Sequence, residues 1–289
     1  DLGGTSIKAG LVDEQGKILC KATCPTLVER GARPVVDDMA KLSLEVIEKG
    51  GYTLDDVKAI GIGLPGIQDP RTGIVPFCTN LYWHEVPVIE WMQETINKPI
   101  YIGNDATVAG LAESVAGVSA GIENSVFLTL GTGVGGGIVL GGKVYSGTNG
   151  VGSELGHMIT VIDGELCTCG NRGCWERYAS ATALIRMGTE AAKAHPESVL
   201  NEAKSISAKT VVDAAKAGDK AAMEVFDRYT YYLAVGIVNI INFVDPEIIA
   251  IGGGVSAAGE FLIQPVREKL AKLVFYKTMP YARVELATL

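Results

Sequence analysis

The spacing of apolar and polar residues changes several times over the first part of the chain. Two segments rich in apolar residues, 7–12 and 17–23, flank an acidic, glycine-containing turn at 13–16 and predict a β-hairpin over 7–23. Beyond it, apolar residues three or four positions apart predict helices, and short apolar runs predict buried strands. These elements are expected at 34–49 (helix), 57–64 (strand), 88–96 (helix) and 99–103 (strand). We therefore expect a first α/β domain over residues 1–103.

Residues 104–289 continue with the same kinds of element and predict a second, larger α/β domain. Helices are expected at 106–116, 179–194, 208–217, 220–243 and 259–274, and strands at 125–130, 136–140, 143–145 and 247–251. The segments 1–16 and 130–142 share one arrangement, in which a glycine-rich reversal joins two strands, and so resemble an internal repeat. The predicted fold class is α/β, with two domains and a cleft between them.

The composition is that of a folded, acidic protein. Of 289 residues, 47% are hydrophobic and 20% are charged, which excludes a disordered chain. The net charge is −8 and no run of basic residues occurs, so we expect no nucleic-acid partner. The longest apolar stretch, 233–244, contains two asparagines and is shorter than the roughly 20 residues that span a bilayer. We expect a soluble protein without a membrane partner.

The six cysteines are unevenly distributed. Three are scattered, whereas Cys167, Cys169 and Cys174 lie within eight residues. The chain opens at Asp1 without an initiator methionine or a secretory signal, so we expect the natural start to lie upstream. Without a signal, the clustering favours a metal site over a disulfide framework and predicts a cytoplasmic location.

The glycine-rich segment Gly131-Thr132-Gly133-Val134-Gly135-Gly136 matches the dinucleotide-binding pattern G-x-G-x-x-G. That pattern requires a helix after the glycines, but strand-like residues follow here, which argues against a Rossmann fold. A glycine hairpin can still bind phosphate, because glycine lets backbone N–H groups converge on an anion. Gly3-Gly4-Thr5 is a second copy, and two such loops favour phosphate binding over the alternative of hairpins without a ligand.

The clustered cysteines and His157 give the spacing H-x₉-C-x-C-x₄-C. Three thiols and an imidazole are ligands that tetrahedral zinc prefers, and four protein ligands close the coordination sphere. We therefore predict a structural zinc ion held by His157, Cys167, Cys169 and Cys174. The alternative, buried thiols beside an unrelated histidine, is disfavoured because Cys-x-Cys-Gly-x-x-Gly-Cys is a poor core pattern.

Asn104-Asp105 lies where a predicted strand meets a predicted helix. A carboxylate at such a junction can face a cleft and accept the proton of an attacking hydroxyl. It can equally do no more than cap the helix, which is the commoner role of an aspartate there. Residue type alone favours the cap.

Four motifs occur in the order in which the superfamily of sugar kinases, actin and heat-shock chaperones places its ATP-site motifs. They are the segment from Asp1 to Thr5, Asn104-Asp105, Gly131–Gly136 and Gly252-Gly253-Gly254. The more specific segments Glu154–His157 and Cys167–Glu176 make nearly the whole chain resemble the ROK (repressor, open reading frame and kinase) family, most closely its bacterial ATP-dependent glucokinases. The resemblance implies an actin-like, hexokinase-like ATPase fold with an interdomain cleft. Family members have more residues at both ends, so we expect the natural chain to extend there.

The resemblance further implies a site for ATP and Mg²⁺. In the family the first aspartate holds Mg²⁺ through water, the two glycine hairpins bind phosphates, and the glycines after a late strand lie beside the adenosine. The corresponding residues are Asp1, Gly3, Gly4, Thr5, Lys8, Gly131, Thr132, Gly133, Gly252, Gly253 and Gly254.

For the sugar, the resemblance reverses the preference for a cap and implies that Asp105 is the catalytic base. It gives His157 two roles, as zinc ligand and as sugar contact. Gly66 and Asn80 are expected to form the wall of the cleft on the first domain. The alternative is that these two residues belong to ordinary loops without a ligand. The residues implied to bind the sugar are Gly66, Asn80, Asn104, Asp105, Glu154, His157 and Glu176.

Three functions are compatible with these motifs. The leading hypothesis is a hexose kinase that phosphorylates the 6-hydroxyl of glucose, or another hexose such as N-acetylglucosamine, N-acetylmannosamine, mannose or allose. The second is a sugar-responsive transcriptional repressor of the same family. The third, an actin-like or chaperone-like ATPase, leaves the cysteine cluster unexplained. The resemblance also implies a homodimer or homotetramer.

Overall fold

A computed structural model describes residues 1–289, and the contacts within it divide the chain into two compact units. Unit 1 comprises residues 1–109 and 146–152, and unit 2 comprises residues 110–145 and 153–289. The chain first passes from unit 1 to unit 2 after Ala109, within helix α3 (Asp105–Ala116), whereas the sequence predicted a boundary after Gly103, before this helix. The hydrophobic pattern indicates where a helix begins but not which core each of its turns joins.

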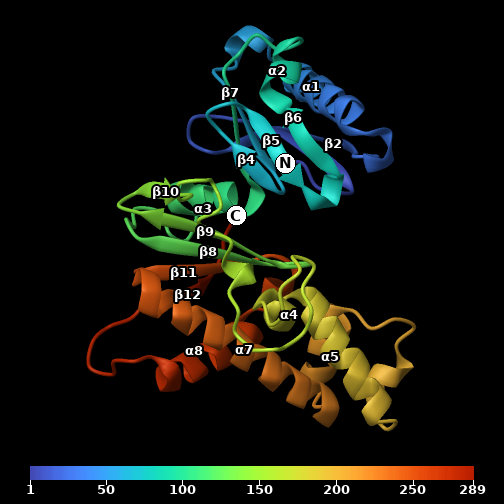
Figure 1. The fold of residues 1–289 in the computed structure, drawn as a ribbon, viewed down its shortest axis with the longest axis vertical. Coiled ribbons are helices and arrows are strands. Elements are labelled where there is room, and N and C mark those ends of the chain that lie inside the picture. Colours follow the sequence, from blue (N-terminus) through green and yellow to red (C-terminus); the bar gives the residue numbers. More distant parts are fainter. The chain divides into compact units, whose positions relative to one another are not determined.

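Unit 1 is built from three small sheets and two helices that precede α3 (Figure 1). Its elements are β1 (Ser6–Val12), β2 (Ile18–Pro25), α1 (Ala32–Lys49), β3 (Ile60–Leu64), β4 (Ile67–Asp69), β5 (Ile74–Cys78), β6 (Trp83–Pro87), α2 (Val88–Gln93) and β7 (Ile100–Asn104). The antiparallel pair β1–β2 confirms the predicted hairpin, and β3 pairs with β7 in parallel. The strands β4, β5 and β6 form an antiparallel sheet that the sequence pattern did not predict.

The core of unit 1 places the start of α3 against the pair β3–β7. On α1, buried apolar residues recur three or four positions apart, as expected for a helix with one face on a core. Val108 of α3 lies over the two strands, where a Cβ added at Gly63 or Gly103 would come within 2.8 Å of one of its methyl groups. The absence of side chains at these two glycines therefore lets α3 approach the strand ends closely.

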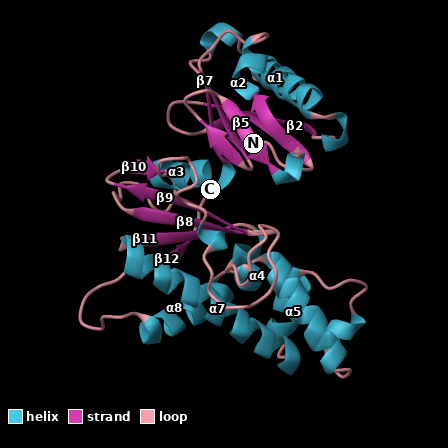
Figure 2. Ribbon diagram, viewed as in Figure 1, coloured by secondary structure: helices cyan, strands magenta, loops and turns pink.

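Unit 2 contains one five-stranded sheet in the order β10-β9-β8-β11-β12. Its elements are β8 (Ser125–Leu130), β9 (Val134–Leu140), β10 (Lys143–Tyr145), α4 (Glu176–Ala179), α5 (Ala181–Ala194), α6 (Ala208–Lys216), α7 (Lys220–Val244), β11 (Ile248–Gly252), α8 (Glu260–Leu273) and β12 (Arg283–Leu286). The first three strands are antiparallel, whereas β8, β11 and β12 are parallel. Helices α7 and α8 lie together on one side of this sheet (Figure 2).

The central strands and the longest helix are buried in the core of unit 2. All five residues of β11 are buried, as is typical of a parallel strand covered on both faces. The N-cap Asp219 accepts a hydrogen bond of 2.9 Å from the backbone N–H of Ala222, and the C-cap of α7 is Asp245, whose φ is 49°. None of the helices combines the length and the apolar character needed to cross a membrane.

The C-terminal half of α3 is fixed within unit 2 by a buried carboxylate. Glu113 is 2% exposed and accepts backbone hydrogen bonds from Val118, Thr288 and Leu289, at 2.8, 2.9 and 2.8 Å. Gly110, one turn earlier, lies against the backbone of Gly137 on β9. One helix is thus held by packing in unit 1 at its start and by hydrogen bonds in unit 2 at its end.

Candidate functional site

The first glycine hairpin is a tight reversal at the start of unit 1. Leu2 and Ile7 pair as antiparallel neighbours, and the Gly3 N–H donates to the Ser6 carbonyl at 2.9 Å. The buried Thr26 hydroxyl donates to the Gly3 carbonyl at 2.6 Å, and the Thr26 N–H donates to the Thr5 carbonyl at 3.1 Å. The loop predicted to bind phosphate is therefore held from behind by one threonine.

Asp1 and Lys8 lie beside this hairpin. The Lys8 ammonium is 3.4 Å from the Asp1 carboxylate, and both side chains are more than half exposed. A cavity of about 770 Å³ in unit 1 reaches the candidate residues only at these two positions, since most of its lining comes from β1, α1 and the region of β3. The Asp1 carboxylate is thus accessible from solvent, as a water-mediated cation ligand has to be.

The second glycine hairpin joins β8 to β9 in unit 2. Gly131 N–H donates to the Gly133 carbonyl at 3.0 Å, and β9 begins at Val134. Because a strand and not a helix follows the glycines, the structure confirms the argument against a Rossmann fold. At the start of α5, the Ala181 N–H donates to the Gly131 carbonyl and the Thr182 hydroxyl donates to the Thr132 carbonyl, both at 2.8 Å.

The third glycine segment lies next to the second hairpin. A Cβ at Gly253 would come within 2.5 Å of the backbone nitrogen of Leu130, the last residue of β8. Gly253 has a φ of 84°, and its carbonyl accepts a 2.7 Å hydrogen bond from the Ser256 hydroxyl. Unit 2 therefore brings the predicted phosphate loop and the predicted adenosine-side loop together at one end of its sheet.

At the junction of β7 and α3, Asn104 caps the helix and the neighbouring Asp105 keeps an exposed carboxylate. The Asn104 side-chain oxygen accepts hydrogen bonds from the N–H groups of Ala106 and Thr107, at 3.0 and 3.1 Å. These bonds make Asn104 the residue that caps the helix. Asp105 is exposed, and the one hydrogen bond to its carboxylate comes from the adjacent Ala106 N–H at 2.8 Å. Asp105 therefore has a second carboxylate oxygen available for chemistry.

Gly66, Asn80 and Asp105 gather around a residue that the sequence did not single out, Cys78. A Cβ at Gly66, whose φ is 89°, would come within 2.7 Å of the Cys78 Cβ, and Asn80 lies in the short turn that follows Cys78. Burial, together with the charge of Asp105, raises the pKa of the Cys78 thiol, which accepts hydrogen bonds from the backbone of Leu81 and Asn80. The thiol is thus neutral, and it lies near both the turn that carries Asn80 and the carboxylate of Asp105.

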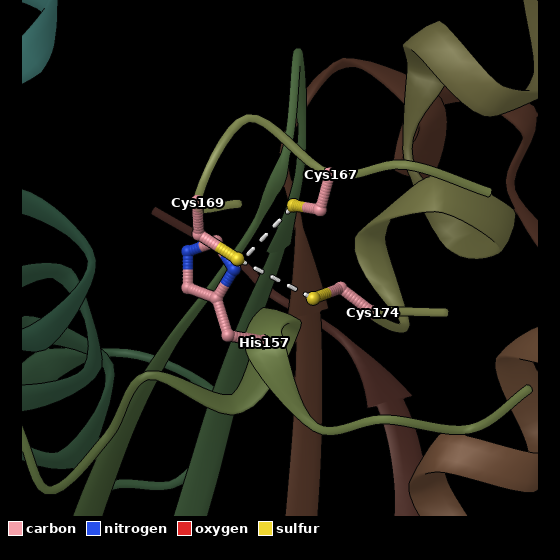
Figure 3. A group of neighbouring side chains, drawn as sticks. All are labelled: His157, Cys167, Cys169 and Cys174. Atoms are coloured by element: carbon pink, nitrogen blue, oxygen red, sulfur yellow. Dashed lines mark hydrogen bonds between the residues drawn. The ribbon is translucent and has the colours of Figure 1, made fainter. Parts of the chain in front are cut away.

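The four predicted zinc ligands converge in unit 2. Figure 3 shows His157, from the turn before the cysteine loop, and the three cysteine side chains pointing toward one another. Their ligand atoms all lie within 4.8 Å of one another, with 3.8 Å from Cys167 Sγ to His157 Nδ1 and 3.5 Å between the sulfurs of Cys169 and Cys174. Ligands about 2.0–2.3 Å from one zinc ion are separated by roughly 3.3–3.8 Å, so this donor set has a spacing suited to tetrahedral zinc.

Glu154 and Glu176 flank this cluster on two sides. His157 turns Nδ1 to the cysteines and has Nε2 3.9 Å from a Glu154 carboxylate oxygen. Glu176 accepts a 3.0 Å hydrogen bond from Cys167, and its other oxygen would lie 2.4 Å from a Cβ at Gly133. Burial, with a further contribution from Glu176, raises the pKa of Cys167 to about 12. The cluster therefore adjoins the second glycine hairpin through one carboxylate.

The sequence profile of the ROK family matches residues 1–289. The chain belongs to the ROK family. The glucokinase of Thermotoga maritima is 40% identical over 279 residues, which cover 95% of this chain and 86% of that enzyme. The crystal structure of a ROK family glucokinase from Streptomyces griseus, in complex with glucose and AMPPNP, covers 99% of this chain and 92% of that one, with a TM-score of 0.85 and 35% identity. The fold is thus the α/β fold of ROK hexokinases.

Transcriptional repressors are also similar to this chain. The xylose repressor of Bacillus spizizenii is 30% identical over 216 residues, which cover 75% of this chain and 53% of the repressor. The glucokinases therefore match at higher identity and over a larger share of their own length. In this ROK chain, Thr26, Cys78 and Thr182 support the candidate loops, but an isolated threonine or cysteine carries no sequence signal that would have identified them.

Proposed function

We propose that this ROK protein is an ATP-dependent hexose kinase that transfers the γ-phosphoryl group of ATP to the 6-hydroxyl of glucose. The observation that carries the proposal is the junction at the end of β7, where Asn104 caps the helix and leaves the exposed Asp105 with a free carboxylate oxygen. The similarity to glucokinases over nearly the whole chain supports glucose as the hexose.

Asp105 acts as the general base in this proposal. Phosphoryl transfer proceeds through a loose transition state, so positioning and charge stabilisation contribute most of the catalysis. The carboxylate accepts the proton of the sugar hydroxyl as its oxygen attacks the γ-phosphorus, and ADP leaves. Asn104 keeps the start of α3 in place through its two hydrogen bonds, so the base is presented on a rigid support.

The two glycine hairpins would hold the phosphates of ATP. Backbone N–H groups of Gly3-Gly4-Thr5 and of Gly131-Thr132-Gly133 suit an anion in a chain whose net charge is −8. Asp1, with Lys8 beside it, would hold Mg²⁺ through water, and that ion would neutralise charge on the phosphates. Gly252, Gly253 and Gly254, which lie against the end of β8, would approach the adenosine.

The cysteine cluster would hold a structural zinc ion, because its four donors have suitable chemistry and spacing. His157, bound through Nδ1, would present Nε2 and the nearby Glu154 to a sugar hydroxyl, and Glu176 would do the same from the other side of the cluster. Gly66, Asn80 and Asn104 complete the proposed sugar contacts. A cytoplasmic location and an assembly of two or four chains remain predictions.

An assay of ADP release with purified protein, ATP and Mg²⁺ tests the function. We expect release with glucose to exceed release with N-acetylglucosamine, N-acetylmannosamine, mannose or allose, and to be very slow without sugar. Sugar binding without ADP release would favour the second candidate, a ROK repressor, which rests on the similarity to xylose repressors. Equal ADP release with and without sugar would contradict both functions and favour a simple ATPase.

A further inference from the structure

The two glycine hairpins share a feature that lies outside their own sequences. In unit 1, the hydroxyl of Thr26 donates to the Gly3 carbonyl at 2.6 Å. In unit 2, the hydroxyl of Thr182 donates to the Thr132 carbonyl at 2.8 Å. Each threonine is far from its hairpin in sequence, by 23 and 50 residues respectively. The same kind of hydrogen bond therefore occurs twice, from two unrelated parts of the chain.

These hydrogen bonds fix the direction of the next N–H group. In a trans peptide unit the C=O and the N–H of the following residue lie in one plane and point in opposite directions. A carbonyl held by a threonine hydroxyl on one side therefore turns the Gly4 N–H, or the Gly133 N–H, to the other side. Gly4 is exposed, and a Cβ placed there would have no atom nearer than the Asn80 carbonyl oxygen at 3.9 Å. No side chain therefore crowds Gly4, and an anion can approach its backbone closely.

Each hairpin is also held at a second carbonyl by a backbone N–H of the same segment. The Thr26 N–H donates to the Thr5 carbonyl at 3.1 Å, and the N–H of Ala181, beside Thr182, donates to the Gly131 carbonyl at 2.8 Å. Two points of attachment prevent the peptide planes from rotating, which glycine would otherwise allow. Thr26 itself is completely buried.

We propose that Thr26 and Thr182 are positioning residues that orient the N–H groups of the two glycine hairpins toward the phosphates of the nucleotide. The proposal rests on the proposed kinase function. The hydroxyl of each threonine is used in a hydrogen bond to a loop carbonyl, so we assign each threonine an action through the loop that it holds. Loss of either hydroxyl would leave the loop intact in sequence but free to turn its N–H groups away.

The test uses Thr26→Val and Thr182→Val, which preserve shape but remove the hydroxyl, and Thr26→Ser and Thr182→Ser, which keep it. Thr230→Val is the matched control for Thr26→Val, because Thr230 is as buried as Thr26 and its hydroxyl bonds only to carbonyls of its own helix, those of Phe226 and Asp227. We expect each valine variant to raise the KM for ATP about tenfold, the size of one lost hydrogen bond, and to leave the KM for glucose unchanged. The serine variants and Thr230→Val should keep the KM of the parent protein.

An unchanged KM for ATP in both folded valine variants would overturn the proposal while the kinase function stood. So would an equal rise in Thr230→Val, since that would indicate a general loss of stability. If Thr26→Val does not fold, the exposed Thr182 gives the result alone. If the parent protein phosphorylates no hexose, the kinase function is wrong. The positioning role of the two threonines is then tested by the affinity for Mg·ADP. Weaker binding of Mg·ADP by the valine variants alone would support this role, and equal binding by all variants would refute it.

Discussion

The glycines of this chain differ in the reason why a residue with a side chain is disfavoured in their place. Gly66 and Gly51 both have positive φ, of 89° and 81°. At Gly51, which follows the C-cap residue of α1, a Cβ would meet nothing within 4 Å, whereas at Gly66 it would lie 2.5 Å from the Phe77 carbonyl oxygen. Gly51 is therefore restricted by backbone conformation alone, and Gly66 by conformation and by the close approach of β5.

This difference predicts unequal losses of stability. Gly51→Ala should lower the free energy of unfolding by about 1–2 kcal/mol, because only the left-handed conformation is penalised. Gly66→Ala should lower it by about 3 kcal/mol or more, because β5 must also move. Urea denaturation of both variants measures the difference. Equal losses would mean that the close contact between Gly66 and β5 does not exist in solution.

At the scale of elements, the sequence predicted long helices and buried strands better than short antiparallel ones. The expected helix at 220–243 and the strand at 247–251 correspond to α7 and β11, because long periodic segments and continuous apolar runs are strong signals. The sheet β4–β6 was missed, since its strands are three to five residues long and β5 contains a proline. That sheet carries the turn with Asn80, so the local support of this candidate residue could not be predicted either.

The loop with the clustered cysteines has little regular structure of its own. Only isolated bridges occur within it, between Ile159 and Cys174 and between Leu166 and Arg172. Such a segment needs another source of order, and the proposed closed zinc site would supply it. Because the pKa of Cys167 is raised, its thiol must lose a proton when the metal binds, so the affinity should fall as the pH is lowered.

We predict one tightly bound zinc ion per chain. Cys174→Ser should reduce the zinc content to near zero and lower the temperature of unfolding, because it removes one of four ligands. Cys20→Ser is the control, since Cys20 lies on β2 outside the cluster, and should leave both quantities unchanged. Elemental analysis and thermal denaturation measure the effects. Substoichiometric zinc in the parent protein, with full activity after chelation, would rule out a structural metal.

At the scale of the whole molecule, the buried apolar residues form two separate clusters, one in each unit. The candidate residues are distributed over both units, and the sequence identified most of them through motif order and not through local pattern. At Asp105 the residue type favoured a cap, and only the hydrogen bonds of Asn104 show which of the two neighbours has that role. Hydrogen-bond partners depend on tertiary packing, which spacing along the chain does not specify.

The central claim, that Asp105 is the base of a sugar kinase, is tested most directly by the steady-state kinetics of Asp105→Asn. Asparagine keeps an oxygen for the Ala106 N–H, so folding and the KM values for glucose and ATP should change by only a few-fold. The kcat should fall about 10²–10⁴-fold, because the variant cannot accept the proton of the attacking hydroxyl. Asp55→Asn, which changes a fully exposed aspartate of unit 1, should keep the kcat of the parent protein. Retention of most of the kcat by Asp105→Asn would contradict the account.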